Sequence, residues 1–273
     1  MNRSWLRVAV GTVAVSTLCW FAQQAAVAQA SAPGGQPFTP SRTADGQPNL
    51  QGVWRVWNTA KYDIEDHPAR PGIPAGKGVI VDPPDGRIPY QAWALAKRKE
   101  NYDNSRTPDP WKSADPLAKC YSPGFPRLTY LGWPFQIAQT PKYVAFMYEW
   151  MHQRRFAYFD PKGRMQGVDF WNGDSRTRWE GNALVVDVAG FNDRTWFDMV
   201  GNFHSEALHV VERYTLVGPD TLQYDVTIED PKVFTRAWKM SMPVYRQKEV
   251  GLLEYECHAL LDEFGIPITW PRE

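Results

Sequence analysis

The chain has 273 residues with 30 basic and 30 acidic side chains, so its formal net charge at pH 7 is zero. This balance excludes the strongly basic surface that is typical of nucleic-acid-binding proteins, and no nucleic-acid partner is expected. The length corresponds to one large domain or two small ones.

The first 28 residues have the pattern of a cleavable signal peptide. Two arginines precede an apolar run, and the run ends in the small residues Ala26, Val27 and Ala28, as at a cleavage site. The run is shorter than the roughly 20 apolar residues that cross a bilayer, and no membrane span is expected anywhere in the chain. We therefore expect a periplasmic or secreted protein from which residues 1–28 are removed.

The next two segments are poor in regular structure. Residues 29–48 are rich in Gly, Pro, Ser and Gln, which predicts a flexible leader. Residues 49–134 are expected to form a loop-rich wrap, because Pro and Gly interrupt nearly every candidate element. One helix is expected within it, since Pro89 at the first turn precedes good helix formers from Tyr90 to Tyr102.

Over residues 135–273 the pattern changes to short runs of β-branched and aromatic residues separated by turn dipeptides. The turns are short, so sequential strands are expected to pair antiparallel in an up-and-down meander. A meander of this many strands closes into a barrel, which removes exposed edges. The expected strands are residues 135–139, 143–151, 155–160, 177–180, 183–188, 208–217, 222–229, 235–242 and 252–258.

One expected hairpin carries an internal check on its register. Pairing Tyr214 with Tyr224 puts the apolar side chains of both strands on one face. The same register places Arg213 opposite Asp225 on the other face, and opposite charges across a strand pair favour it. Glu212 then lies in the middle of the apolar face.

Several segments resemble known proteins. The Gly-x-Trp element at Gly52 and Trp54 is similar to the one that opens the first strand of lipocalin-like (calycin) barrels. Five segments resemble a widespread family of exported bacterial proteins: VDPPDGRIPY at 81–90, WNGDSR at 171–176, WEGNALVVD at 179–187, LHVVERY at 208–214 and YECH at 255–258. This resemblance implies a mainly β fold and an exported location. With the meander, it predicts a lipocalin-like barrel whose first strand lies in the wrap.

The candidate catalytic residues are Glu212, His152 and Arg176. A carboxyl buried among apolar residues is the environment that produces a general acid or base, with Arg154, Arg176 or His152 stabilising an oxyanion. The alternative is structural: an ion pair between Glu212 and an inward-facing arginine such as Arg176 or Arg236. His152 and Arg154 end an aromatic strand, where they would either hold a carboxylate or form a solvated strand end.

The candidate ligand-binding residues are Arg154, Trp171, Asp174, Tyr214, Tyr224 and Trp238. Trp171 and Asp174 precede a hairpin, and loops on a rigid barrel are common places for binding groups. The three other aromatic residues would line a cavity for a small apolar or aromatic molecule.

The five histidines show no metal-ligand spacing, so neither a metal nor another cofactor is expected. Cys120 and Cys257 are the only cysteines after the signal peptide, and an oxidising compartment favours a disulfide between them. The alternative is two separate buried thiols.

Three functions remain open from the sequence. The first is a lipocalin-like binder of an apolar or aromatic small molecule. The second is a cofactor-independent lyase, isomerase or hydrolase on the same barrel. The third is an envelope interaction protein with a filled barrel. Nothing in the sequence predicts the ligand or the oligomeric state.

Overall fold

The computed structural model describes residues 38–106, 113 and 115–263. The expected signal peptide lies outside these residues, as does the first part of the expected leader. Its second part contains a hydrogen-bonded turn in which Arg42 pairs with Pro48, so regular backbone bonding begins before residue 49. Within the described residues, no helix is long and apolar enough to cross a membrane.

The helices are α1 (Ala92–Ser105) and α2 (Cys257–Glu263), with short 3₁₀ turns η1 (Pro116–Lys119), η2 (Arg127–Tyr130) and η3 (Pro161–Gly163). The strands are β1 (Gly52–Arg55), β2 (Ile80–Asp82), β3 (Phe135–Gln139), β4 (Tyr143–Tyr148), β5 (Arg154–Tyr158), β6 (Asp174–Glu180), β7 (Ala183–Ala189), β8 (His209–Gly218), β9 (Thr221–Glu229) and β10 (Trp238–Gln247).

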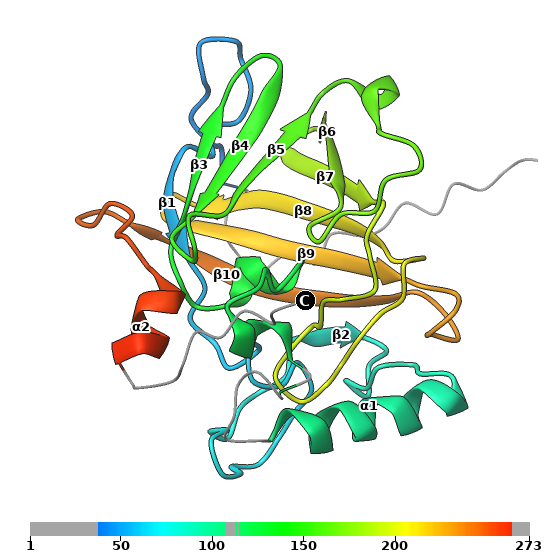
Figure 1. Ribbon diagram of the computed structural model, residues 1–273. Helices are drawn as coiled ribbons and strands as arrows, with labels where there is room; N and C mark the ends of the chain where they lie inside the picture. The colour runs from blue at the N-terminus through cyan, green and yellow to red at the C-terminus, as the bar shows by residue number, and fades with distance from the viewer. Residues whose placement is uncertain (1–37, 107–112, 114, 264–273) are drawn as a thin grey trace, which may run out of the picture. The chain divides into compact units, whose positions relative to one another are not determined.

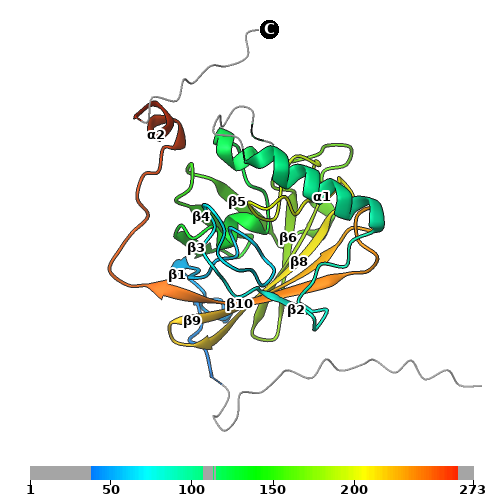
Figure 2. The same ribbon diagram turned by 90° about the horizontal axis from the view of Figure 1, so that it is seen from below.

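Nine of these strands close into a barrel, which confirms the expected mainly β fold (Figure 1). Strands β3 to β10 follow one another around the wall in chain order, and β1 pairs with both β3 and β10. The barrel is therefore completed by a strand from the wrap. β2 pairs with the first part of β10, on the edge where β1 pairs with the last part of that strand. Figure 2 shows α1 crossing one end of the barrel.

One wall contact differs from the expected antiparallel meander. β5 and β6 are parallel, and Tyr158 with Arg176 is their one register pair. The connection of residues 159–173 returns the chain to the end of the barrel from which β5 started, and it is too long for a tight hairpin turn. The expectation of antiparallel pairing throughout was therefore wrong at this seam.

The expected β8–β9 register is confirmed. Tyr214 pairs with Tyr224, and Arg213 pairs with Asp225. The Tyr214 and Tyr224 rings pack at a tilt in the barrel interior with centroids 4.8 Å apart, and the Tyr214 ring also packs against Phe146 of β4 at 5.3 Å. Aromatic side chains from opposite walls thus fill this part of the core, and each contributes about 1.5–3 kcal/mol by its burial.

The expected strand at residues 252–258 was wrong. β1 already pairs with β10, so the barrel offers no free edge to a further strand. The segment instead continues outside the wall, where Tyr255 stacks on Trp150, and then forms α2. The strand expected at 235–242 begins and ends later, and β2 was not expected at all.

Cys120 and Cys257 form the expected disulfide, with Cα atoms 5.6 Å apart. Their positions differ from those expected, because Cys257 begins α2 rather than lying in a last strand. The bond ties the segment after η1 to the C-terminal segment. A disulfide that closes the loop between residues 120 and 257 stabilises the folded chain by about 5 kcal/mol in the chain-entropy model.

Candidate functional site

A cleft of about 440 Å³ lies at the seam between β5 and β6. The two strands share a single register pair, so they do not form a continuous ladder there. Six residues of the connection between the two strands complete the lining. The apolar part of the lining comes from Phe156, Tyr158, Met165 and Phe170, and the polar part from Arg154, Arg155, Asp160, Asn172, Asp174, Ser175 and Arg176.

The turn into β6 requires a glycine. Gly173 has a φ of +64°, a left-handed conformation that side chains with a Cβ rarely adopt. A Cβ at this position would lie 2.6 Å from a methyl carbon of Val188 and 2.9 Å from the ring of Phe191. The turn therefore fixes where β6 begins, and with it the three cleft residues that follow.

Charged side chains hold the connection against β6 and β7. Arg164 donates to the Asp187 carboxylate at 2.6 Å and to the Asp174 carbonyl oxygen at 3.0 Å. The Asp174 carboxylate accepts hydrogen bonds from the Met165 backbone N–H at 3.0 Å and from Arg176 at 2.8 Å. Two of the predicted site residues, Asp174 and Arg176, therefore neutralise each other and shape the cleft.

Two cleft residues are buried and keep polar atoms without a protein partner. Arg155 is 5% exposed and Ser175 is 3% exposed. Within the described residues, the Nε and Nη1 atoms of Arg155 and the Oγ atom of Ser175 make no hydrogen bond. A buried donor without an acceptor is destabilising by about 1–3 kcal/mol, and the Arg155 guanidinium instead packs over the rings of Phe125 at 4.1 Å and Phe146 at 4.7 Å inside the barrel.

The remaining donor atom of Arg155, Nη2, binds Glu212 in the barrel interior at 2.5 Å. Glu212 is 0% exposed, and its other oxygen accepts hydrogen bonds from the hydroxyls of Tyr214 at 3.1 Å and Tyr224 at 2.5 Å. The ion pair expected for Glu212 is present, but the expected partners Arg176 and Arg236 were wrong. Arg236 instead pairs with Asp82 outside the core.

The electrostatics of this group keep the guanidinium charged. Burial acts to lower the pKa of Arg155, but the attraction of Glu212 outweighs it and the net shift is upward. Burial, with the negative charge of Glu212, raises the pKa of both Tyr214 and Tyr224 well above the ordinary value. Both tyrosines are therefore phenols that donate to the carboxylate.

The other predicted residues lie outside the cleft. His152 is exposed on the β4–β5 turn, with Nε2 2.9 Å from the Glu256 carboxylate. Trp171 packs edge-on against Tyr121 with ring centroids 5.6 Å apart. Trp238 is fully buried in the core, as are the two tyrosines bound to Glu212. Of the predicted residues, the cleft brings together Arg154, Asp174 and Arg176.

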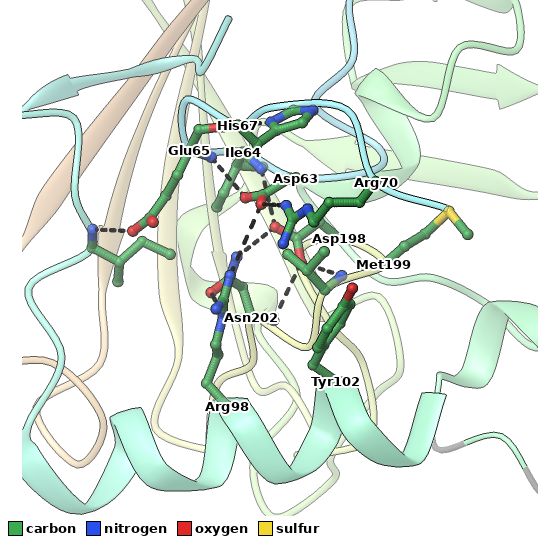
Figure 3. A network of polar contacts seen from close by, with 12 residues as sticks. Asp63, Ile64, Glu65, His67, Arg70, Arg98, Tyr102, Asp198, Met199 and Asn202 are labelled. Carbon is green, nitrogen blue, oxygen red and sulfur yellow. Dashed lines mark hydrogen bonds and ion pairs between the residues drawn. The ribbon is translucent and has the colours of Figure 1, made fainter. Parts of the chain in front are cut away.

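A second polar cluster connects the wrap, α1 and the β7–β8 connection (Figure 3). The Asp198 carboxylate accepts N–H donors from the backbone of Ile64, Val200 and Asn202 and from the Asn202 side chain, at 2.5 to 3.2 Å. Asp63 lies beside it and pairs with Arg70 at 2.5 Å. Burial, and then the charge of Asp63, raises the pKa of Asp198 to about 7.

A smaller cleft of about 200 Å³ opens beside this second cluster. It also contains buried atoms that lack a partner among the described residues, namely Nε2 of His67 and Nε of Arg70. Its lining is almost entirely charged, however, and Arg70 and Arg87 are each paired with a carboxylate. No group of three or more His, Cys, Asp or Glu side chains in the described part of the chain is arranged to hold a metal ion.

Sequence reasoning missed Arg155, Ser175 and Phe156. A usable signal was present in the alternation of β5, because side chains two residues apart share a face. Arg155 shares the buried face with Ala157, whereas Arg154 and Phe156 point outward. Following that alternation would have identified Arg155 as the inward-facing arginine that Glu212 requires.

A scan against family models finds no match to this chain, and a search of curated proteins finds none either. The fold and the cleft define a nine-stranded β-barrel protein with a cleft of mixed apolar and charged lining in its wall.

Proposed function

We propose that the protein binds a small molecule with an apolar or aromatic body in the cleft between β5 and β6. The observation that carries this proposal is the combination of exposed rings, Phe156 and Tyr158, with charged side chains in the lining of one cleft. The volume of about 440 Å³ falls in the range of about 300–1,000 Å³ that is usual for small-molecule sites. The proposed site therefore lies in the barrel wall and not at the core tyrosines.

The barrel interior supports a different role for the core residues. The oxygens of Glu212 are occupied by Arg155, Tyr214 and Tyr224, and the carboxylate is shielded from solvent. Acid/base catalysis would require a substrate atom to reach it. Binding without chemistry is therefore the function that this geometry favours.

Export belongs to the same proposal. The Cys120–Cys257 disulfide is of the kind that forms in oxidising compartments. It supports the expectation from the N-terminal pattern that the protein acts in the periplasm or outside the cell, together with membership of the exported family that the sequence resembles.

A neutral aromatic probe, N-phenyl-1-naphthylamine, tests the proposed site by its fluorescence on binding. The Phe156→Ser variant should weaken binding about tenfold, because it removes roughly the apolar contact of half a buried ring. Tyr245→Ser is the matched control, since Tyr245 lies on β10 and is 38% exposed against 39% for Phe156. Equal effects of the two substitutions, or no binding at all, would contradict the proposal.

A further inference from the structure

We infer that the ligand of the cleft is a short extended peptide with free termini, and that it adds to the unpaired edge of β5. The inference rests on the proposed function, because it names the chemical class of the ligand for the same cleft. Three features of the cleft support it: backbone groups of β5 that have no partner strand, opposite charges at the two ends of the cleft, and a ring surface between them.

One edge of β5 is paired along its length. The Gln153 carbonyl oxygen and the Phe159 N–H are hydrogen-bonded to β4 and to the residue before β4. Backbone bonding alternates along an antiparallel pair, so Arg155 and Ala157 also direct their N–H and C=O groups to β4.

The other edge of β5 is paired at a single residue. Arg154, Phe156 and Tyr158 direct their N–H and C=O groups toward β6. Tyr158 is in register with Arg176. Among the described residues, the backbones of Arg154 and Phe156 have no such partner in β6 or in the connection before it. An unpaired strand edge is a template for another extended chain.

This unpaired edge borders the open space of the cleft. Arg155 lines the cleft, although its side chain is 3% exposed and packs over the Phe125 ring inside the barrel. The main chain of β5 is therefore what the cleft exposes at this position. From Tyr158 back toward Arg154 the two strands share no further register pair, and the cleft lies where a partner strand would be.

The two ends of the cleft carry opposite charges. Arg176 and Asp174 neutralise each other, and the charge of Arg155 is paired inside the barrel. Within the described part of the chain, the lining residues without an ion pair are Arg154 and Asp160. A lining with one unpaired charge of each sign favours a zwitterion over an anion or a cation.

The positions of these two charges set the length and direction of the peptide. Arg154 and Asp160 are six positions apart, which is about 20 Å along an extended chain. Their side chains occupy part of this distance and leave room for about three extended residues. The peptide carboxylate would meet Arg154 and its ammonium group would meet Asp160, so the peptide runs antiparallel to β5.

The ring surface determines which residue of the peptide is aromatic. Phe156 and Tyr158 follow Arg154 at alternate positions, so all three side chains project from the outer face of β5. In an antiparallel tripeptide whose third residue lies opposite Arg154, the first residue lies opposite Phe156, on the same face. A phenylalanine there would pack against the Phe156 ring, which is supported edge-on by Tyr143 at 5.3 Å between centroids.

The peptide Phe-Ala-Ala with free termini is the probe. Its counterpart is N-acetyl-Phe-Ala-Ala amide, which has the same ring and no terminal charges. Isothermal titration calorimetry measures the binding of each to the purified protein. The charged peptide should bind at least about tenfold more tightly, because it forms an ion pair at each end. Arg154→Gln and Asp160→Asn should each remove most of this preference, with little change for the counterpart.

The matched control is Arg178→Gln, because Arg178 is an exposed arginine on β6 that pairs with Glu180 and does not line the cleft. It should leave the preference unchanged. Asp160→Asn keeps an oxygen that can accept the Lys162 backbone N–H, so the turn after β5 is retained in this variant.

Two isomers of the probe test the addition to the strand edge. N-methylation of the third residue removes an N–H that faces β5, whereas N-methylation of the second residue removes one that faces away. The first isomer should bind at least about tenfold more weakly than Phe-Ala-Ala, and the second no more than about threefold more weakly. Equal binding of the two isomers would overturn strand addition.

The outcomes separate this inference from the proposed function. If N-phenyl-1-naphthylamine binds and Phe156→Ser weakens it, but Phe-Ala-Ala binds no more tightly than its counterpart, the peptide inference is wrong and the proposed function stands. If neither the naphthylamine nor the peptides bind, both are wrong. An unchanged preference in Arg154→Gln and Asp160→Asn would also overturn the inference.

Discussion

Among the residues that the structure describes, two carboxylates are 0% exposed, Asp198 in the loop cluster and Glu212 in the barrel, and their surroundings differ. Each oxygen of Asp198 accepts two N–H donors, and those donors come from backbone and side chains of the same region. Glu212 instead depends on one guanidinium and two phenols. The guanidinium keeps two nitrogen atoms without a hydrogen-bond partner among the described residues and packs over the rings of Phe125 and Phe146, whereas all four hydrogen bonds to Asp198 come from N–H donors.

Both carboxylates therefore hold the fold together, but they join different parts of it. A carboxylate that is surrounded by backbone N–H groups joins segments of the chain, and little of its bonding capacity faces outward. A carboxylate that pairs with an arginine from a distant strand joins two walls of the barrel instead. We therefore assign the Asp198 cluster to the folding of the wrap and the Arg155–Glu212 pair to support of the cleft.

Breaking the Arg155–Glu212 pair should have the largest effect on stability. Arg155→Met leaves Glu212 buried without a counter-ion, which should lower the free energy of unfolding by about 3–5 kcal/mol. The double variant Arg155→Met with Glu212→Leu removes both charges and should recover most of this loss. Urea denaturation measures both. A double variant as unstable as the single one would show that the pair is not held by its charges.

The pH dependence of stability should distinguish the Asp198 cluster. Asp198 has a pKa of about 7 in the folded protein, against an ordinary value of 3.8 in the unfolded chain. Between these values the folded state binds more protons than the unfolded chain, so this group lowers the free energy of unfolding as pH rises from about 4 to about 7. Asp198→Asn should remove this decline.

The control for that experiment is Asp193→Asn, an exposed aspartate on the same connection. The denaturation midpoint of wild type and of each variant is measured at pH 5 and at pH 7.5, and the change of midpoint between the two pH values is compared. The same change of midpoint with pH in wild type and in Asp198→Asn would show that Asp198 does not cause the pH dependence.

The smallest expected effect comes from a comparison of two buried hydroxyls on one strand. Ser175 and Thr177 are both buried on β6, but only the Thr177 hydroxyl has a partner, the Val185 carbonyl oxygen at 2.9 Å. Thr177→Val should lower the free energy of unfolding by about 1 kcal/mol, whereas Ser175→Ala should not lower it, because the Ser175 hydroxyl has no hydrogen bond to lose. Thermal denaturation without ligand compares them, and a larger loss for Ser175→Ala would indicate a structural use of its hydroxyl.

Local patterns in the sequence were sufficient to predict the regular part of the barrel. The β8–β9 hairpin follows from alternation and from the charges of Arg213 and Asp225, and the burial of Glu212 follows from the same register. The disulfide was predictable because an oxidising compartment was expected and the two cysteines after the expected signal peptide allow a single pairing.

The site was less predictable because it depends on a nonlocal arrangement. The connection between β5 and β6 begins with a turn signal at residues 160–163 that is typical of a hairpin, so the parallel β5–β6 contact and its cleft could not be anticipated. The partner of Glu212 is separated from it by more than fifty residues, and only the closed barrel selects Arg155 among the available arginines. The wrong prediction of a strand at residues 252–258 has the same cause. The pairing of β1 with β10 depends on the whole fold, and local sequence does not show it.

The closure by β1 also bears on the order in which the protein folds. β6 to β10 form a continuous meander of neighbouring segments, and such local pairing carries a small entropic penalty. Val53 of β1 pairs with Gln247, near the other end of the described chain. This contact becomes favourable only when both flanking strands are already in place, so we expect β1 to join late. Trp54, buried in β1 beneath the Arg246 side chain at 4.1 Å, would then acquire its native environment only as the ring of strands closes.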